Sequence, residues 1–160
     1  MDRTVGLADD AAAMEFAIAE ARLAAAEGDI PVGAVVVTSG TVVARRHNER
    51  EKTGDPCAHA EILALRDAAQ RLGRWRLMDC TMVVTLEPCP MCAGALVAAR
   101  LGRLVFGAAD PKTGACGSLY NLCADPRLNH EVPVERGFLG ERCAAVLTEY
   151  FANRRAPAEP

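Results

Sequence analysis

Residues 80–92 read CTMVVTLEPCPMC, and this stretch decides the fold of the chain. Its first part, residues 80–85, is a short apolar run typical of a strand, which Glu87 and Pro88 end. Its last part begins a helix expected over residues 89–100, whose first turn carries both Cys89 and Cys92. A strand that leads into a helix, repeated along a chain, is typical of α/β proteins, in which helices cover a sheet.

The rest of the chain alternates in the same way. An alanine-rich segment that Asp10 can cap favours helix, and Asp55-Pro56 has the form of a second helix start. The further helices are expected at 10–27, 57–72 and 140–155, and the further strands at 32–37, 41–46, 103–106 and 131–136. We therefore predict one domain over residues 1–160, an α/β fold with three α/β/α layers around a mixed sheet of about five strands.

Composition is that of a globular chain, with 51% hydrophobic and 24% charged residues in 160. No run of about 18 apolar residues is present, which argues against a membrane span. No signal-peptide core follows residues 1–5, so seven cysteines favour reduced thiols or metal ligands over disulfides. We expect a cytoplasmic protein.

The net charge of −3 argues against a uniformly basic, nucleic-acid-binding surface. The arginines are nevertheless clustered along the chain, and a local basic patch or ordinary solvated side chains both fit this pattern. The clusters are Arg45, Arg46 and Arg50; Arg71, Arg74 and Arg76; and Arg154 and Arg155.

The motif His59-Ala60-Glu61 precedes Pro88, with 26 residues between Glu61 and Pro88. With Cys89 and Cys92, His59 offers one neutral nitrogen and two thiolates to a metal ion. Three protein ligands with no obvious fourth are typical of catalytic zinc, whereas structural zinc is closed by four. The sequence therefore predicts one catalytic zinc ion in each subunit.

Both halves of this pattern fall at expected helix starts. There the first-turn N–H groups are unpaired and the partial charge is positive, so cysteine ionises more easily. Cys89 and Cys92, three residues apart, share one helix face. Glu61 is expected to stay off the metal, because its side chain diverges from that of His59, and to transfer protons between water and the substrate.

The pattern H-x-E…P-C-x-x-C is typical of zinc-dependent nucleobase deaminases. From about residue 14 to residue 155, the chain closely resembles the bacterial tRNA-specific adenosine deaminases, which have the cytidine-deaminase-like fold. The segments that carry this resemblance are IPVGAV (30–35), AHAE (58–61), TLEPC (85–89), MCAGA (91–95), VFGA (105–108), KTGA (112–115) and GSL (117–119).

The resemblance implies that adenosine is converted to inosine at the wobble position of a tRNA, in particular an arginine tRNA with an ACG anticodon. It implies a homodimer that contacts the anticodon stem-loop with both subunits. His59, Cys89 and Cys92 match the zinc ligands of that family, and Glu61 matches its proton shuttle.

The resemblance also points to substrate-binding residues. Asn48 matches a contact to the flipped base and its ribose, and Asp110 lies in the loop that flanks the substrate pocket. Tyr150, Phe151 and Arg154 lie on a terminal helix that contacts the anticodon loop. Ordinary structural roles remain open: Asn48 and Asp110 as turn residues, and Phe151 as a core residue with Tyr150 as its exposed neighbour.

Other functions are compatible with the zinc motif. A free-base or nucleoside deaminase acting on guanine or cytosine would share the chemistry. A non-catalytic RNA-binding protein stabilised by zinc would need a fourth ligand, from another cysteine, His47 or His130. The remaining cysteines and Trp75 are expected to be packing residues: Cys57, Cys80, Cys116, Cys123, Cys143 and Trp75.

Overall fold

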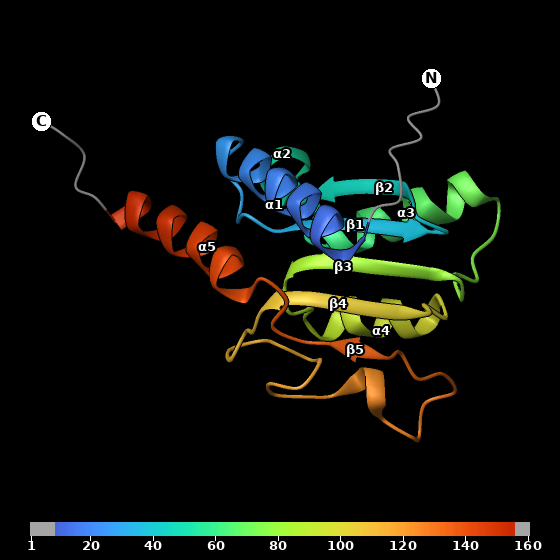
Figure 1. Cartoon of the computed structure of the whole chain (residues 1–160). Helices are drawn as coiled ribbons and strands as arrows, with labels where there is room; N and C mark the ends of the chain where they lie inside the picture. The colour runs from blue at the N-terminus through green and yellow to red at the C-terminus, as the bar shows by residue number, and fades with distance from the viewer. Residues whose placement is uncertain (1–8, 156–160) are drawn as a thin grey trace, which may run out of the picture.

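A computed structural model describes residues 9–155 of the chain (Figure 1). Residues 1–5, which entered the signal-peptide argument, lie outside the described residues. The strands are β1 (Gly33–Thr38), β2 (Thr41–His47), β3 (Cys80–Leu86), β4 (Arg103–Ala108) and β5 (Val134–Glu135). The helices are α1 (Asp10–Ala26), α2 (Arg50–Thr53), α3 (Ala60–Leu72), α4 (Pro90–Ala98) and α5 (Gly140–Arg155), with a 3-10 turn η1 (Leu122–Ala124).

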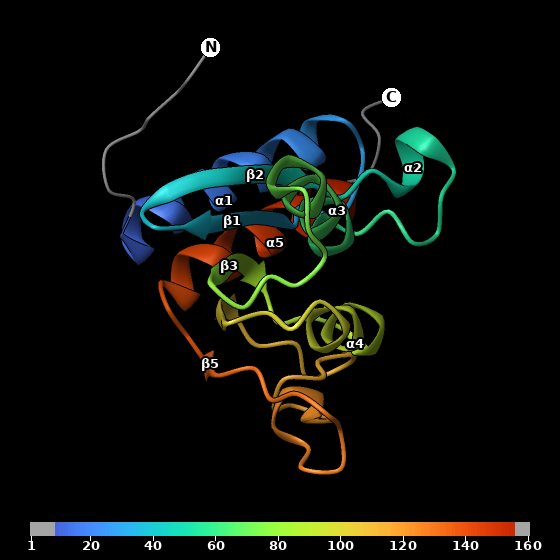
Figure 2. The ribbon, with the colours of Figure 1, turned by 90° about the vertical axis from the view of Figure 1, so that its right-hand side faces the viewer.

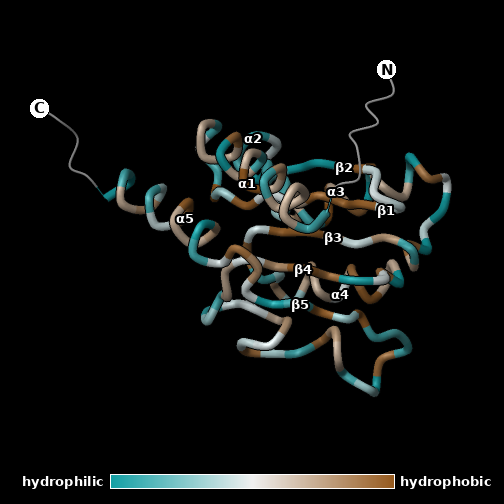
Figure 3. Tube along the Cα trace, viewed as in Figure 1, coloured by the Kyte–Doolittle hydropathy of each residue, from teal (hydrophilic) through white to brown (hydrophobic). Residues whose placement is uncertain are grey.

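The strands form one mixed sheet in the order β2-β1-β3-β4-β5. The pairs β1–β2 and β1–β3 are antiparallel, whereas β3–β4 and β4–β5 are parallel. The central strands are the most hydrophobic part of the sheet (Figure 3). The predicted α/β class with five strands is therefore confirmed.

Alternation along the central strands divides the core into two layers. Val35, Val83 and Val105 lie side by side in the register and belong to one apolar cluster with α1 and α5. Their neighbours along the chain face a second cluster, which includes residues of α3 and α4. In Figure 1, α1 lies in front of the sheet and α3 and α4 behind it, and Figure 2 shows the same layers from the side. This is the three-layer arrangement expected from a period of two.

The first helix starts one residue away from its predicted cap. Asp9 caps α1, because its Oδ1 accepts a hydrogen bond from the Ala12 amide at 2.8 Å. Asp10 lies in the first turn and binds Arg103 of β4 instead, through two hydrogen bonds of 2.9 and 2.6 Å. Asp9 therefore caps the helix, and Asp10 links α1 to the sheet.

The metal-bearing helix α3 begins at Ala60, later than predicted. Asp55 accepts a hydrogen bond from the Cys57 amide at 2.8 Å and closes a tight turn instead of capping a helix. His59 is therefore the residue before the helix, with extended backbone. The strand expected over residues 131–136 is reduced to β5, since Pro133 has no N–H to donate to a ladder.

Within residues 9–155, every helix is too short or too polar to cross a membrane.

Candidate active site

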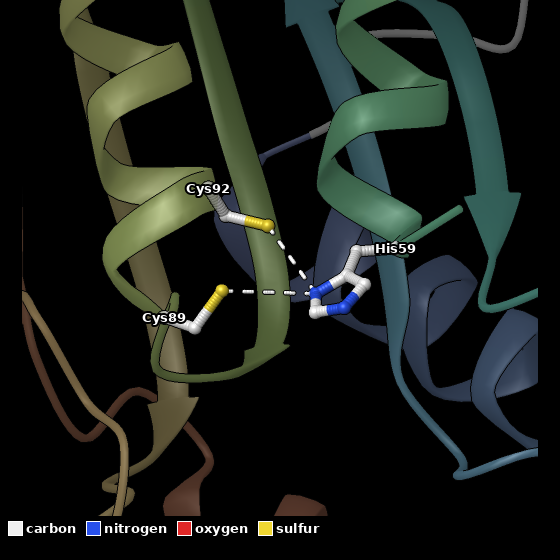
Figure 4. A group of neighbouring side chains, drawn as sticks. All are labelled: His59, Cys89 and Cys92. Atoms are coloured by element: carbon white, nitrogen blue, oxygen red, sulfur yellow. Dashed lines mark hydrogen bonds between the residues drawn. The ribbon is translucent and has the colours of Figure 1, made fainter. Parts of the chain in front are cut away.

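The three predicted metal ligands converge between the starts of α3 and α4. His59 precedes α3 and Cys89 precedes α4, while Cys92 lies in the first turn of α4. Nδ1 of His59 lies 3.7 Å from Sγ of Cys89 and 3.5 Å from Sγ of Cys92 (Figure 4). Within the described part of the chain, this is the one group of three such side chains close enough to share a metal ion.

These distances fit zinc. Bond lengths of about 2.3 Å to sulfur and about 2.0 Å to nitrogen, at tetrahedral angles, place the two kinds of ligand atom about 3.6 Å apart. The measured separations agree with this edge length. His59 and the two cysteines are thus arranged as three corners of a tetrahedron, and the donor set matches that of zinc.

The two cysteines influence each other's pKa in opposite directions. A hydrogen bond from Cys92 lowers the pKa of Cys89 to about 4, against the effect of burial, and His59 adds to the lowering. The same bond raises the pKa of Cys92. The hydrogen bond between His59 and Cys89 raises the pKa of His59. Cys89 is therefore a ready thiolate at neutral pH, as its place at a helix start favours.

Glu61 lies in the first turn of α3 and is 4% exposed. It lines a cavity of about 370 Å³ together with His59 and Cys89. Burial raises the pKa of its carboxyl group to about 7. A group with such a pKa can both accept and return a proton near neutral pH, as a general acid–base catalyst must.

Asn48 lies in the same cavity and is 5% exposed. Its Oδ1 accepts a hydrogen bond from the Ala60 amide at 2.8 Å, so it caps α3 in place of His59, whose side chain makes no such bond. The family resemblance implied that Asn48 contacts the flipped base and its ribose. In the structure the acceptor is used internally, and the Nδ2 donor is the part of the amide left for a substrate.

Asp110 reaches the cavity from the loop after β4. Its Oδ1 accepts hydrogen bonds from the amides of Lys112 and Thr113, and its Oδ2 accepts one from the Thr113 hydroxyl at 2.7 Å. Asp110 therefore orders a turn, and that turn forms part of the cavity wall. Its contact with a substrate stays a prediction.

Sequence reasoning did not assign a role to Glu87, which also lines the cavity and is 2% exposed. Burial would raise the pKa of this carboxyl group, but hydrogen bonds from the Ser118 side chain and from the loop backbone outweigh burial and lower it. A charged residue beside a metal ligand at the end of an apolar strand was the signal available in the sequence. Arg50 and Thr113 complete the polar lining.

The three predicted residues of the terminal helix do not line this cavity. Tyr150 and Arg154 line a separate groove of about 460 Å³ between α1 and α5, hereafter the α1–α5 groove. The Tyr150 hydroxyl and Arg154 Nη2 both donate to the Gly28 carbonyl oxygen, at 3.4 and 3.1 Å. Phe151 is 39% exposed and packs edge-on against Tyr150, so it is not a core residue.

The candidate fourth ligands for a structural zinc are engaged elsewhere. His47 bonds Glu20 and Glu27, at 2.7 and 3.0 Å. Nε2 of His130 bonds the Leu101 carbonyl oxygen. Among the described residues, the remaining cysteines do not join the group of His59, Cys89 and Cys92 either. These observations favour a catalytic site over a structural one, because a structural zinc site needs a fourth protein ligand.

The predictions for packing residues were right for four of the six. Cys80, Cys116, Cys123 and Cys143 are buried. Cys57 is exposed, in the turn before α3. Trp75 is also wrong as a packing residue, since it is 54% exposed and the Arg76 guanidinium lies 4.3 Å from its ring centroid.

Comparison with known proteins supports this geometry. The model of the cytidine and deoxycytidylate deaminase zinc-binding region matches residues 7–108. A tRNA-specific adenosine deaminase of Bacillus subtilis (strain 168) is 48% identical over 142 residues, 89% of this chain and 88% of that protein. A solved structure from a study of A-to-I editing by tRNA:A34 deaminases at the wobble position of transfer RNA has a TM-score of 0.82. It is 42% identical and covers 84% of this chain and 98% of its own.

A guanine deaminase from Nitrosomonas europaea is more distant, with a TM-score of 0.79 and 28% identity over 92% of this chain and 87% of its own. The region matched by the family model contains His59, Cys89, Cys92 and Glu61. The zinc cofactor predicted from the sequence is therefore confirmed. The chain belongs to the tRNA-specific adenosine deaminases, within the zinc-dependent cytidine and deoxycytidylate deaminases.

Proposed function

We propose that this protein deaminates adenosine to inosine at the wobble position of a tRNA, in particular an arginine tRNA with an ACG anticodon. The observation that carries the proposal is one cavity lined by Glu61, Asn48 and two members of the His59-Cys89-Cys92 tripod, His59 and Cys89. The 48% identity to a tRNA-specific adenosine deaminase supports adenosine as the substrate.

The residues divide the chemistry between them. Zinc, when bound by the three ligands, supplies a Lewis acid that makes water available as a nucleophile at neutral pH. Glu61 accepts one proton of the attacking water and delivers it to the ring nitrogen N1, and it then transfers the remaining proton of the new C6 hydroxyl group to the amino group, which leaves as ammonia. The carbon–nitrogen bond at C6 breaks, a carbon–oxygen bond replaces it, and adenine becomes hypoxanthine.

Asn48 and the loop wall orient the base. Because Asn48 Oδ1 is fixed on the Ala60 amide, its Nδ2 group is held as a donor toward an acceptor atom of the base or ribose. Asp110 and Thr113 contribute further polar lining. The target nucleotide has to leave its stack to enter such a cavity, which an anticodon loop permits at low cost.

The rest of the tRNA contact is assigned to the α1–α5 groove. Arg154 is exposed and has no carboxylate partner within residues 9–155, and its guanidinium lies 4.9 Å from the Tyr150 ring centroid. Exposed aromatic rings and arginines suit the bases and phosphates of an anticodon stem-loop. We further propose that the enzyme acts as a homodimer in the cytoplasm, with both subunits contacting one stem-loop.

The test is a deamination assay with purified protein and unmodified tRNA, in which inosine is mapped by sequencing. Inosine is expected at the wobble adenosine of the ACG anticodon and is expected to be missing with Glu61→Gln. Free guanine and cytosine are tested in parallel, because the likeness to a guanine deaminase favours this second candidate. Deamination of a free base with tRNA left unchanged contradicts the proposal.

A further inference from the structure

Glu87 follows β3 and stands two residues before the metal ligand Cys89. Its carboxylate is buried and accepts four hydrogen bonds, all from the segment that follows β4. Oε1 accepts from the Asp110 amide at 3.1 Å and from the Ser118 hydroxyl at 2.5 Å. Oε2 accepts from the amides of Cys116 and Ser118, at 3.1 and 3.0 Å. Both oxygens are thus fully used.

The loop approaches this carboxylate too closely for a side chain to intervene. A Cβ placed on Gly114 would lie 2.3 Å from Oε2 of Glu87. The backbone adds its own link, since the Ala115 amide donates to the Pro88 carbonyl oxygen at 2.8 Å. Residues 110–118 are therefore wrapped around Glu87, and the chain continues from Glu87 through Pro88 to the metal.

The wrapped loop also builds the wall of the cavity. Asp110 and Thr113 face the space that holds Glu61 and His59. Asp110 thus has two connections: its amide bonds Glu87, and its carboxylate fixes the Thr113 backbone and hydroxyl. A displacement of the Glu87 carboxylate would be passed to this wall and would change its distance from the metal ligands.

We propose that Glu87 is a positioning residue, which holds the Asp110–Thr113 wall at the distance from the metal ligands that the substrate requires. A buried carboxylate is costly to the fold unless it is hydrogen-bonded. An apolar residue would fill the same volume without this cost, but it could not hold four donors of a loop in place. The inference rests on the proposed function, because it concerns the same cavity.

The experiment compares Glu87→Gln with wild type in the tRNA deamination assay, together with zinc content per chain. Glutamine has nearly the same shape but replaces one acceptor oxygen by an NH₂ group, which faces two loop donors. A wall misplaced by about 1 Å is expected to lower kcat/KM by about 100-fold. Zinc content is expected to stay at one per chain. The KM for tRNA is expected to rise, and kcat is calculated per zinc-loaded chain.

A double-mutant cycle with Thr113→Ala separates positioning from a general effect on the fold. If Glu87 acts through the wall, Thr113→Ala costs much less activity in the Glu87→Gln background than in wild type. Ser118→Ala removes a single bond to the same carboxylate and is the milder variant. It is expected to raise KM severalfold with zinc unchanged, and it keeps the inference testable if Glu87→Gln fails to fold.

The outcomes are distinct. Wild-type protein that leaves tRNA unchanged refutes the proposed function, and this inference with it. Active wild type with a Glu87→Gln or Ser118→Ala variant of unchanged KM and kcat overturns the inference alone. Strict additivity in the cycle, or a loss of activity that only follows the loss of zinc, also overturns it.

Discussion

The zinc cavity and the α1–α5 groove are both hollows lined by residues that the sequence singled out, yet they are built differently. In the cavity, the side chains of Glu61, Asn48 and Glu87 are nearly inaccessible to solvent. Hydrogen bonds fix Asn48 on the start of α3 and Glu87 on the loop after β4. In the groove, Tyr150 and Arg154 both donate hydrogen bonds to the carbonyl oxygen of Gly28. Figure 1 shows α5 extending away from the sheet.

This difference has a consequence for function. Chemistry at a single atom requires groups held to within a fraction of an ångström, and buried, saturated side chains provide this. A long polyanion requires charge and stacking surface, and exposed side chains can provide it at lower precision. Substitutions in the cavity should therefore change kcat by large factors, whereas those in the groove should change tRNA affinity by small ones.

The largest effect is expected from loss of a metal ligand. Cys89→Ala leaves two ligands, which cannot hold zinc at the affinity of three, so turnover of tRNA should fall below detection. Elemental analysis of the purified variant should find little zinc. The matched control is Cys57→Ala, an exposed cysteine in the turn before α3, which should keep both zinc and activity. A Cys89→Ala protein with full zinc content contradicts the assigned tripod.

Glu61→Gln should keep the metal and lose the reaction. Glutamine fills the same buried volume but cannot accept a proton, so kcat should fall by about 10³-fold. Zinc content and tRNA affinity should remain close to wild type, measured by elemental analysis and by filter binding. A Glu61→Gln variant with unchanged kcat would falsify the role of Glu61 as the proton carrier. A protein in which neither variant nor wild type turns over tRNA, while both bind zinc and RNA, would be a non-catalytic zinc protein.

Asn48 allows the two functions of one side chain to be separated. Asn48→Asp retains an oxygen for the Ala60 amide but loses the NH₂ donor, so kcat/KM should fall by about tenfold or more with stability preserved. Asn48→Ala loses the cap as well, which should lower the free energy of unfolding by about 1 kcal/mol. Urea unfolding of both variants measures the difference. Equal stability of the two would show that the bond to Ala60 contributes little.

The contrast between the two regions also explains what the sequence could predict. The tripod could be predicted because a recognisable motif marks each of its halves: Cys89 and Cys92 lie on one helical turn, and His59 stands at the start of another helix. The layers of the fold followed from alternating apolar residues in the same way. Two predicted helix starts were wrong: the neighbouring Asp9 caps α1 in place of Asp10, and Asp55 closes a turn with the Cys57 amide.

Contacts distant in sequence were beyond such reasoning. Glu87 binds residues 23 to 31 positions away, and no periodicity marks that pairing. The Gly28 carbonyl that receives Arg154 lies 126 positions from it. The role of Arg154 came from a family resemblance, and the structure adds only its surroundings. It remains a prediction.

In the groove, Arg154→Ala should raise the KM for tRNA by a few-fold and leave kcat unchanged. If Arg154 neutralises a phosphate, the slope of log affinity against log salt should become less steep by about one. Arg142→Ala is the matched control on the same helix, because Arg142 is paired with Glu15 and should have a smaller effect. An unchanged salt slope for Arg154→Ala would limit this side chain to its contact with Gly28.

The smallest effect is expected at His47, which lies between the two regions. Its neighbour in sequence, Asn48, reaches the cavity, and one of its partners, Glu27, ends α1 beside the groove. Burial tends to lower the pKa of His47, but hydrogen bonds from the imidazole to Glu20 and Glu27 outweigh burial and raise it. Its protonated form therefore stabilises the fold.

The sign of the pH dependence follows. This contribution is complete below the pKa of an unfolded histidine, about 6.5, and disappears as the pH rises through the higher pKa of the folded state. His47→Gln should lower the free energy of unfolding by about 0.5 kcal/mol at pH 6 and by less at pH 9. Arg45 and Lys52, which also pair with Glu20 and Glu27, remain in place and keep the effect small. Urea unfolding at both pH values measures the difference between His47→Gln and wild type. A difference that stays constant with pH would mean that His47 stabilises the fold through packing and not through its charge.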